Sequence, residues 1–390
     1  MTSSSAASFT TGAILLWVVT IVAPAVVVSL AAPPSRPHAV RRTLQHERLS
    51  SGVLFSETEI AARGKKGSDE VNQWHVLSLF FFSTNGPSWW QNGGWASVAP
   101  TCTWYGVQCN YAGNVTSIRL KNNSLTGELT PSLAMLPYLT TFLLDDNSIE
   151  GTLPQEWGNV PDAFPSLQTL SVASNDLEGT LPDWSFGFRS LYSFRLDGNR
   201  LNGSLPAAWP TASFAATLTA LILRNNALSG TIPDSWATTS GSWKYLSTVL
   251  LSGNQLQGPL PPLLFSASPY LSWLDLGRND LSGTLPAEWG TSIPRVLQLT
   301  LSHNRLSGPL PPAWASSTLY QQAVVMDLSS NGFVGGIPWC TAKRPSLNVS
   351  SNALSGPFNF TCFGYDCPRL QTMDFAGNQF CGSYCGLPTC

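Results

Sequence analysis

The feature of this sequence that most constrains its fold is a motif that recurs along most of its length. Aligned on one asparagine, the pattern LxxLxLxxNxLxGxLPxxW returns with varying fidelity at intervals of 21 to 28 residues. One copy of this length cannot bury its apolar side chains alone, so neighbouring copies have to stack on one another. The aligned asparagines are Asn123, Asn147, Asn175, Asn199, Asn226, Asn254, Asn279, Asn304, Asn331, Asn352 and Asn378.

The period and the motif together predict a leucine-rich repeat solenoid. We expect an α/β-type, right-handed horseshoe or spiral, with short parallel strands on its concave face and disulfide-bearing caps at its ends. In the copy LSWLDLGRN, Leu271, Leu274 and Leu276 are expected to face inward. Trp273 and Asp275 then alternate outward, as a short strand requires.

Two further positions of the motif need a structural role. The asparagine that ends each strand is expected to bond backbone groups, so that equivalent asparagines form a ladder. The tryptophan of LPxxW is compatible with a carbohydrate platform, but its regular spacing favours packing in the core on the convex side. These tryptophans are Trp157, Trp209, Trp236, Trp289 and Trp314, with Trp184 and Trp339 as shifted versions.

The organisation of the chain follows from its composition. The run 13–32 is uncharged, long enough to cross a bilayer and rich in small residues at its end, which indicates a secretory signal peptide over 1–31. An uncleaved N-terminal anchor is the alternative, because arginines follow the run. The other predicted parts are a flexible basic spacer (32–70), an N-terminal cap (71–112), leucine-rich repeats (113–340), and the last repeats with a cysteine-rich cap (341–390).

The eight cysteines lie at the two ends of the repeat region. In an exported chain this distribution indicates disulfides in the caps. We expect Cys102 to pair with Cys109, because the other six cysteines are remote in sequence, and the fifteen pairings of those six stay open. A zinc site is the competing interpretation, since two C-terminal cysteine pairs have suitable spacings, but the predicted export disfavours it.

Five Asn-x-Ser/Thr triplets are candidate glycosylation sites, which fits a protein of the secretory route. In register, Asn348 points from its strand toward the concave face, so a glycan there would block binding near the C-terminal end. The five candidate acceptors are Asn114, Asn122, Asn202, Asn348 and Asn359.

The segment CTWYGVQC, followed by NxLxGxLPxxW coils, resembles the plant-type subclass of extracellular leucine-rich repeat proteins. That subclass includes receptor-kinase ectodomains and polygalacturonase-inhibiting proteins. The stretches GTLPAEWG and GTLPQEW are similar in style to the promastigote surface antigens of kinetoplastid protists. The resemblance covers about 71–390, and it implies a cell-surface or secreted glycoprotein, often lipid-anchored, that binds other molecules. The sequence stops at Cys390 without the apolar tail of a lipid-anchor signal, so we expect secretion, attachment through the N-terminal segment, or an incomplete gene model.

Composition and motifs argue against several classes of function. A net charge of −2 offers no basic surface for nucleic acid. The sequence contains no nucleophile elbow, HExxH or phosphate-loop pattern, and three of its four histidines precede the repeats. We therefore expect no enzymatic activity, no cofactor and no metal.

The predicted binding surface is the outward side of the strands on the concave face, because solenoids usually bind their partners there. Arginine and tryptophan are the favoured contacts, since they dominate the energetics of interfaces. The predicted ligand-binding residues are Arg119, Lys121, Arg195, Arg224, Trp273, Asp275 and Arg278, and Asp145, Asp197 and His303 lie on the same predicted face.

These observations predict a non-enzymatic, cell-surface or secreted glycoprotein that binds a protein or a glycan through its concave face. The expected location is extracellular, and the N-terminal apolar segment offers a route of membrane attachment. The main alternative is a secreted inhibitor of a hydrolase, and a structural coat protein is a further one.

Overall fold

The structure is a computed structural model that describes residues 73–238, 243–339, 346–357 and 373–381. The chain divides into two units, 1–54 and 55–390, and every described residue belongs to the second. The predicted signal peptide (1–31) and spacer (32–70) lie outside the described residues. Within the described ranges, no helix combines the length and the apolar character that a membrane span requires.

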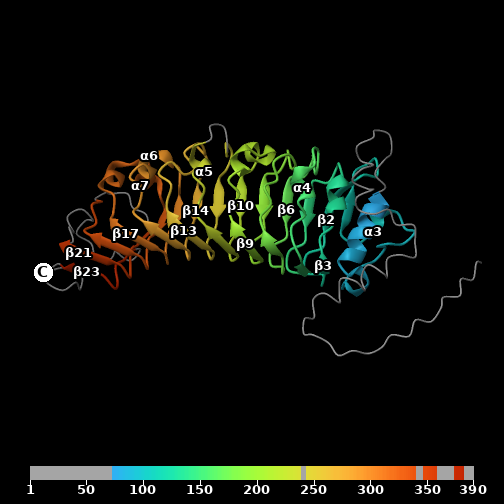
Figure 1. The fold of residues 1–390 in the computed structure, drawn as a ribbon, viewed down its shortest axis with the longest axis horizontal. Coiled ribbons are helices and arrows are strands. Elements are labelled where there is room, and N and C mark those ends of the chain that lie inside the picture. Colours follow the sequence, from blue (N-terminus) through green and yellow to red (C-terminus); the bar gives the residue numbers. More distant parts are fainter. Residues whose placement is uncertain (1–72, 239–242, 340–345, 358–372, 382–390) are drawn as a thin grey trace, which may run out of the picture. The chain divides into compact units, whose positions relative to one another are not determined.

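The described part is a leucine-rich repeat solenoid, as the sequence predicts (Figure 1). Each coil contributes one short strand to a sheet of 12 strands, which we call the main sheet. All neighbours in it are parallel except β1 and β2, which pair antiparallel at the N-terminal edge. The strands are β1 Val107–Cys109, β2 Val115–Arg119, β4 Thr141–Leu143, β6 Thr169–Ser171, β8 Ser193–Arg195, β10 Ala220–Ile222, β12 Thr248–Leu250, β14 Trp273–Asp275, β16 Gln298–Thr300, β18 Val325–Asp327, β20 Ser346–Asn348 and β22 Met373–Asp374.

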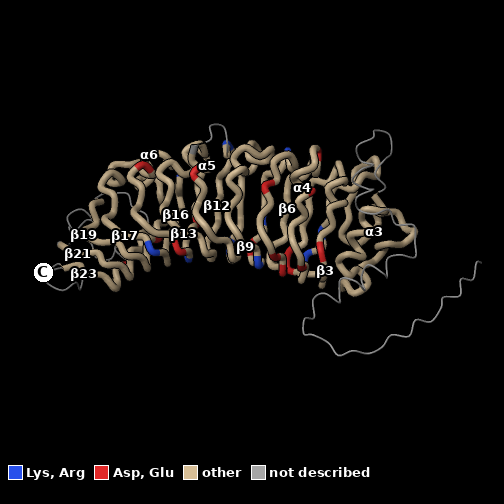
Figure 2. The backbone as a smooth tube through the Cα atoms, in the orientation of Figure 1, with Lys and Arg blue, Asp and Glu red and all other residues tan. Residues whose placement is uncertain are grey.

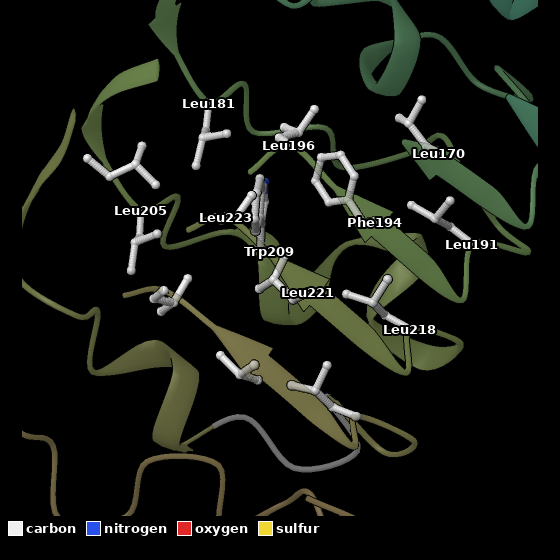
Figure 3. Close-up of a cluster of buried hydrophobic side chains, with 14 of the residues drawn as sticks. Leu170, Leu181, Leu191, Phe194, Leu196, Leu205, Trp209, Leu218, Leu221 and Leu223 are labelled. Carbon is white, nitrogen blue, oxygen red and sulfur yellow. The ribbon is translucent and has the colours of Figure 1, made fainter. Parts of the chain in front are cut away.

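The apolar positions of successive coils share one interior. Leu170, Phe194 and Leu221 are paired in register on neighbouring strands, and all three are fully buried. Figure 3 shows Trp209 beside this column, with its ring among the leucines of the adjoining segments. The prediction that the leucines of separate copies form a continuous core is confirmed.

The predicted asparagine ladder is present. The Asn254 Nδ2 donates to the carbonyl oxygens of Leu251, at 2.9 Å, and of Leu223 in the preceding coil, at 3.0 Å. Its Oδ1 accepts from the Leu228 backbone N–H at 3.1 Å. Equivalent bonds link each neighbouring pair of coils from Asn147 to Asn378, so one side chain per coil satisfies backbone groups that the turn would leave unpaired.

A second sheet follows the asparagines, and the sequence analysis did not predict it. The shift between its strands is two residues per coil, since Thr180 pairs with Asn202 although its equivalent in the repeat is Ser204. On the main sheet, equivalent positions pair directly. The second-sheet strands are β7 Glu178–Thr180, β9 Arg200–Ser204, β11 Ala227–Gly230, β13 Gln255–Pro259, β15 Asp280–Gly283, β17 Arg305–Pro309, β19 Gly332–Gly335, β21 Ala353–Pro357 and β23 Gln379–Cys381, and β3 Thr126–Glu128 pairs separately with β5 Ser148–Glu150.

Short helices carry the chain back to the next strand. None of them is longer than five residues, because prolines and glycines interrupt each return segment. They are η3 Pro131–Met135, α4 Glu156–Asn159, η4 Trp209–Thr211, η5 Ser213–Ala216, α5 Ser235–Thr238, α6 Trp289–Ser292, η6 Pro312–Ser316 and α7 Thr318–Gln322.

The tryptophans of LPxxW are core residues, as predicted. Trp289 and Trp314 are fully buried. Each donates its indole N–H to a proline carbonyl of the preceding coil, Trp289 to Pro261 at 3.1 Å and Trp314 to Pro286 at 3.0 Å. The shifted Trp184 and Trp339 make the same type of bond. These rings are therefore not available as a carbohydrate platform.

The N-terminal end of the solenoid is covered by aromatic side chains. Helix α3 (Gln73–Ser83) contributes Phe80, whose ring centroid lies 5.9 Å from that of Phe142 in a neighbouring coil. The short helices η1 (Gly86–Ser88) and η2 (Thr101–Thr103) follow, with Trp89 and Trp95 packed edge to face at 5.0 Å. These rings keep water from the first coil's interior.

The structure contains the predicted Cys102–Cys109 disulfide, with Cα atoms 5.5 Å apart. Cys381 is also disulfide-bonded. The remaining cysteines, Cys340, Cys362, Cys367, Cys385 and Cys390, lie outside the described residues.

Candidate binding surface

The outward side of the main sheet is formed by rows of side chains that run from coil to coil. One row contains the first residue of most strands, and its members are small or polar except at Trp273 and Val325. The row comprises Ser117, Thr141, Thr169, Ser193, Ala220, Thr248, Trp273, Gln298, Val325 and Ser346. Trp273 is therefore the one aromatic side chain in this row, and 36% of it is exposed.

Trp273 lies in a cluster with two other predicted contacts, and we call it the Arg224 cluster (Arg224, Ser252, Trp273 and Asp275). The Arg224 guanidinium carbon lies 5.1 Å from the centroid of the Trp273 ring, within cation–π range. The Nη2 of Arg224 donates to the Oδ2 of Asp275 at 2.6 Å. This ion pair passes over the intervening coil, whose Ser252 hydroxyl donates to the same oxygen at 2.8 Å.

Neighbouring side chains and backbone groups cover the Asp275 and Asp145 carboxylates. Only 7% of Asp275 and 9% of Asp145 is exposed. The second oxygen of Asp275 accepts from the Gly277 N–H at 3.1 Å, and Asp145 accepts from the Ser171 hydroxyl and the Ala173 N–H. Neighbouring groups use both carboxylates, so each one stabilises the sheet surface rather than facing a ligand.

The N-terminal basic residues lie in other coils, away from the Arg224 cluster. The Arg119 Nε donates to the Ser117 hydroxyl at 3.0 Å, and the Lys121 ammonium lies 3.1 Å from Asp146. Both side chains sit on the first coils of the solenoid, so the structure does not bring them to the cluster.

Arg195 and Asp197 pair with each other on one coil, at 3.4 Å. Arg278 and His303 are exposed at the residue before the ladder asparagine, where the backbone is left-handed, with φ of 53° and 55°. Neither takes part in the ion pair or the ring contact of the Arg224 cluster. Of the seven predicted ligand-binding residues, the structure brings together Arg224, Trp273 and Asp275.

A threonine or serine recurs at or just after the ends of β5, β7, β9, β11 and β15, and the sequence analysis overlooked it. In four coils a threonine, and in one coil a serine, directly follows the glycine of the motif. All five side chains are exposed. An added Cβ at Gly308 would lie 2.7 Å from the Thr284 methyl, so that methyl occupies the space that the next coil's glycine leaves open. The recurring tetrapeptide GT(L/I)P was the sequence signal from which this row could have been predicted. The row consists of Thr152, Thr180, Ser204, Thr231 and Thr284.

Charged side chains are sparse on the solenoid. Figure 2 shows them mostly along the edge that carries β3, β9 and β13, with few on the faces of β12 and β16. Several pair across coils, such as Arg200 with Asp176 and, at 2.7 Å, Arg305 with Asp280. In the described part of the chain, no group of three or more His, Cys, Asp or Glu side chains is arranged to hold a metal ion.

The candidate glycosylation sites differ in accessibility. Asn122 and Asn202 are exposed, while Asn114 and Asn348 are half-buried. The Asn348 Oδ1 accepts from the Ser350 N–H and hydroxyl, at 3.1 and 2.8 Å, on the main sheet. Asn359 lies outside the described residues.

Comparison with known proteins defines the class. The Leucine Rich Repeat family model matches residues 217–238 and 295–317. The fold is that of a leucine-rich repeat solenoid, and it resembles the leucine-rich repeat ectodomains of plant receptor kinases and a plant ice-binding protein.

Particular relatives can be named. A leucine-rich repeat receptor-like kinase of Arabidopsis thaliana is 34% identical over 158 residues, which are 40% of this chain and 15% of that protein. MDIS1-interacting receptor like kinase 1, from the same plant, is 30% identical over 27% of this chain and 10% of its own length. This chain therefore spans a small fraction of these curated relatives, and the matched segments lie in the repeats.

Two solved structures match over most of the chain. A plant ice-binding protein is 25% identical, with a TM-score of 0.62 over 82% of this chain and 98% of that chain. The ectodomain of the Arabidopsis receptor kinase HAESA, in complex with an IDA peptide hormone, is 27% identical, with a TM-score of 0.58 over 84% of this chain and 54% of that chain.

Proposed function

We propose that this protein is an extracellular, non-enzymatic binding protein whose main-sheet face binds a peptide or protein partner at the Arg224 cluster. The observation that carries the proposal is the exposed Trp273 ring, the one aromatic side chain of its row, held by Arg224. A fixed aromatic ring beside a guanidinium is the type of group that dominates binding energy. The similarity to HAESA supports it, because that ectodomain was solved with a peptide hormone.

Contacts within the Arg224 cluster hold its side chains in place before a ligand binds, and this favours binding. Ser252 holds Asp275, Asp275 holds Arg224, and Arg224 supports the Trp273 ring, so little rotamer freedom is lost when a ligand contacts the ring. A partner that covers the ring also removes the exposed part of a large apolar side chain from water.

A peptide selection tests this proposal. Peptides selected from a random library on the wild-type protein should bind Trp273→Ala at least about tenfold more weakly, because truncation of an interface tryptophan costs about 2 kcal/mol or more. Trp90→Ala is the matched control, since Trp90 is 68% exposed at the N-terminal end, away from the main-sheet face. If the selected peptides bind Trp273→Ala as tightly as wild type, the cluster is not the binding site.

Export through the secretory pathway is part of the same proposal, with 1–31 as a signal peptide or an N-terminal anchor. N-terminal sequencing of the protein recovered from cells and from medium separates the two. Removal of N-glycans should increase its electrophoretic mobility if sites such as Asn122 and Asn202 are used. A chain that retains residue 1 and carries no glycan would contradict export.

A second candidate function is binding to ice, and the threonine row of the second sheet favours it. Ice presents water molecules in a periodic array, and equivalent residues of a solenoid recur at a constant translation. Four of the five exposed hydroxyl side chains, from Thr152 to Thr231, occupy consecutive coils, Pro259 stands in the next coil, and Thr284 follows, with its methyl seated over the next glycine. The match to 98% of a plant ice-binding protein supports this candidate.

Ice recrystallisation and thermal hysteresis assays test the second candidate. Thr231→Lys, in the middle of the row, should abolish any effect on ice growth. Gln298→Lys adds the same charge at an exposed position on the main sheet and should leave the effect unchanged. Absence of an effect from the wild-type protein would rule the candidate out.

A further inference from the structure

A pocket of about 540 Å³ lies at the edge of the solenoid where the return segments enter the strands β14, β16 and β18. Three consecutive coils form it. Its lining residues are Tyr270, Ser272, Pro294, Arg295, Leu297, Thr318 and Gln322. The volume falls within the range of ligand pockets, about 300–1,000 Å³. The pocket lies outside the Arg224 cluster, although Ser272 immediately precedes Trp273 in the chain.

A stack of four side chains borders this pocket. The Tyr245 and Tyr270 rings are stacked, with centroids 6.2 Å apart and planes 15° from parallel. Lys244 Nζ lies 5.1 Å from the Tyr245 centroid, and the Arg295 guanidinium carbon lies 5.7 Å from the Tyr270 centroid. The rings therefore hold two exposed cations on coils that are two apart.

The lining is suited to an anionic, hydroxyl-rich ligand. Arg295 is the one charged residue among the seven, and no acidic residue opposes it. The Ser272 hydroxyl donates to the Ser247 carbonyl and the Thr318 hydroxyl to the Gly290 carbonyl, so the lone pairs of both oxygens can accept from a ligand. The Gln322 amide adds donors and an acceptor, and Tyr270 and Leu297 provide apolar surface.

The backbone at this edge is not available for a peptide strand. The Ser247, Ser272 and Leu297 carbonyls each accept two N–H groups from the following coil, such as Leu297 and Gln298 on Ser272 at 2.8 and 3.0 Å. A peptide that binds by strand addition needs free backbone groups. A ligand that binds at this edge cannot use these three carbonyls and relies on the polar side chains instead, which suits the many hydroxyls of a glycan.

We propose that this pocket, together with the Lys244–Arg295 stack, binds an acidic oligosaccharide built from uronic acids. One sugar carboxylate pairs with Arg295, a second reaches Lys244 along the stack, and ring hydroxyls bond Ser272, Thr318 and Gln322. The charge of the two cations selects an acidic over a neutral sugar. This site is independent of the peptide-binding surface and goes beyond the proposed function.

Calorimetric titration of the full-length protein with a hexagalacturonate and with its neutral methyl ester tests the proposal. Arg295→Gln should weaken hexagalacturonate binding at least about tenfold, because it removes a charge-assisted hydrogen bond. Lys244→Gln should weaken it about threefold, since its contact is solvent-exposed. Arg305→Gln is the matched control, because it removes one exposed charge on the second sheet and should leave the affinity unchanged.

Two further arms define the ligand class and the independence of the site. An oligoglutamate of equal charge should bind much more weakly than the hexagalacturonate, and Trp273→Ala should leave hexagalacturonate binding intact. The proposal is overturned if the methyl ester or the oligoglutamate binds as tightly as the acid, or if Arg295→Gln and Arg305→Gln behave alike. Circular dichroism of each variant confirms that a loss of binding is not a loss of fold.

Discussion

Single buried polar side chains connect the coils of this solenoid. Each ladder asparagine bonds backbone groups of its own coil and of the coil before it, as Asn254 does with Leu251 and Leu223. Each tryptophan of the return segments bonds the preceding coil in the same way, as Trp289 does with Pro261. Substitution of a ladder asparagine leaves backbone groups in two coils without partners, and substitution of such a tryptophan leaves one carbonyl of the preceding coil without its partner.

Asn254→Ala should therefore lower the free energy of unfolding by about 3 kcal/mol, because two carbonyls and one N–H lose a buried partner. Urea unfolding followed by circular dichroism measures the change. Asn202→Ala is the control, since Asn202 is exposed on β9 and its loss should cost little. Equal effects of the two substitutions would show that the ladder does not stabilise the fold.

Among the elements, the two sheets differ in how their strands align. Equivalent residues pair directly on the main sheet, whereas the second sheet shifts by two residues at each strand. The glycine of the motif adopts φ near +80° in both the first and the late coils, for example +82° at Gly127 and +76° at Gly335. Its surroundings differ, because the end of α3 lies against Gly127, whereas no atom of the described residues lies within 4 Å of a Cβ built at Gly335.

Gly127→Ala and Gly335→Ala compare one backbone conformation in two environments. Both substitutions carry the cost of a side chain at positive φ, about 1 kcal/mol. At Gly127 the added Cβ would also lie 2.2 Å from the Ser83 carbonyl oxygen, and a backbone atom cannot rotate away. We expect Gly127→Ala to be more destabilising by about 2 kcal/mol in thermal or urea unfolding. A smaller loss at Gly127 than at Gly335 would contradict this packing of α3 on β3.

At the scale of the whole molecule, each coil packs mainly against its two neighbours, so stability adds up along the stack and the ends are the weak points. Helix α3 and the rings around it close the N-terminal end, where Phe80 packs on Phe142, Trp89 and Trp95.

Phe80→Ala should expose the first coils to local unfolding while the central coils keep their protection. Removal of a buried phenylalanine lowers the free energy of unfolding by about 3–5 kcal/mol, and here the coils at the N-terminal end lose that stability. Hydrogen exchange resolved by residue should show faster exchange over β2 and β4 and little change over β12 and β14. Phe82→Ala on the same helix is the control, because half of that side chain is exposed. Uniformly faster exchange would mean that the solenoid opens as one unit.

The sequence by itself determined the coil: which leucines face inward, that the recurring asparagines form a ladder, and that Trp289 and its equivalents are buried. These follow from a short repeat, because every copy meets the same neighbours. The Cys102–Cys109 pair is local and was predictable for the same reason. The sequence predicted the asparagine at the end of the main-sheet strand, whereas β14 ends at Asp275 and Asn279 directly precedes β15.

Only the tertiary structure decided which side chains of different coils meet. Arg224 reaches Asp275 across 51 residues, and Tyr245 stacks on Tyr270, which are pairings that depend on coil lengths and rotamers rather than on the motif. The second sheet and its two-residue shift could not be predicted either, because the segment after each asparagine contains glycine and proline, which weaken a strand prediction. The motif specifies a coil, but a surface arises from contacts between residues that differ from coil to coil.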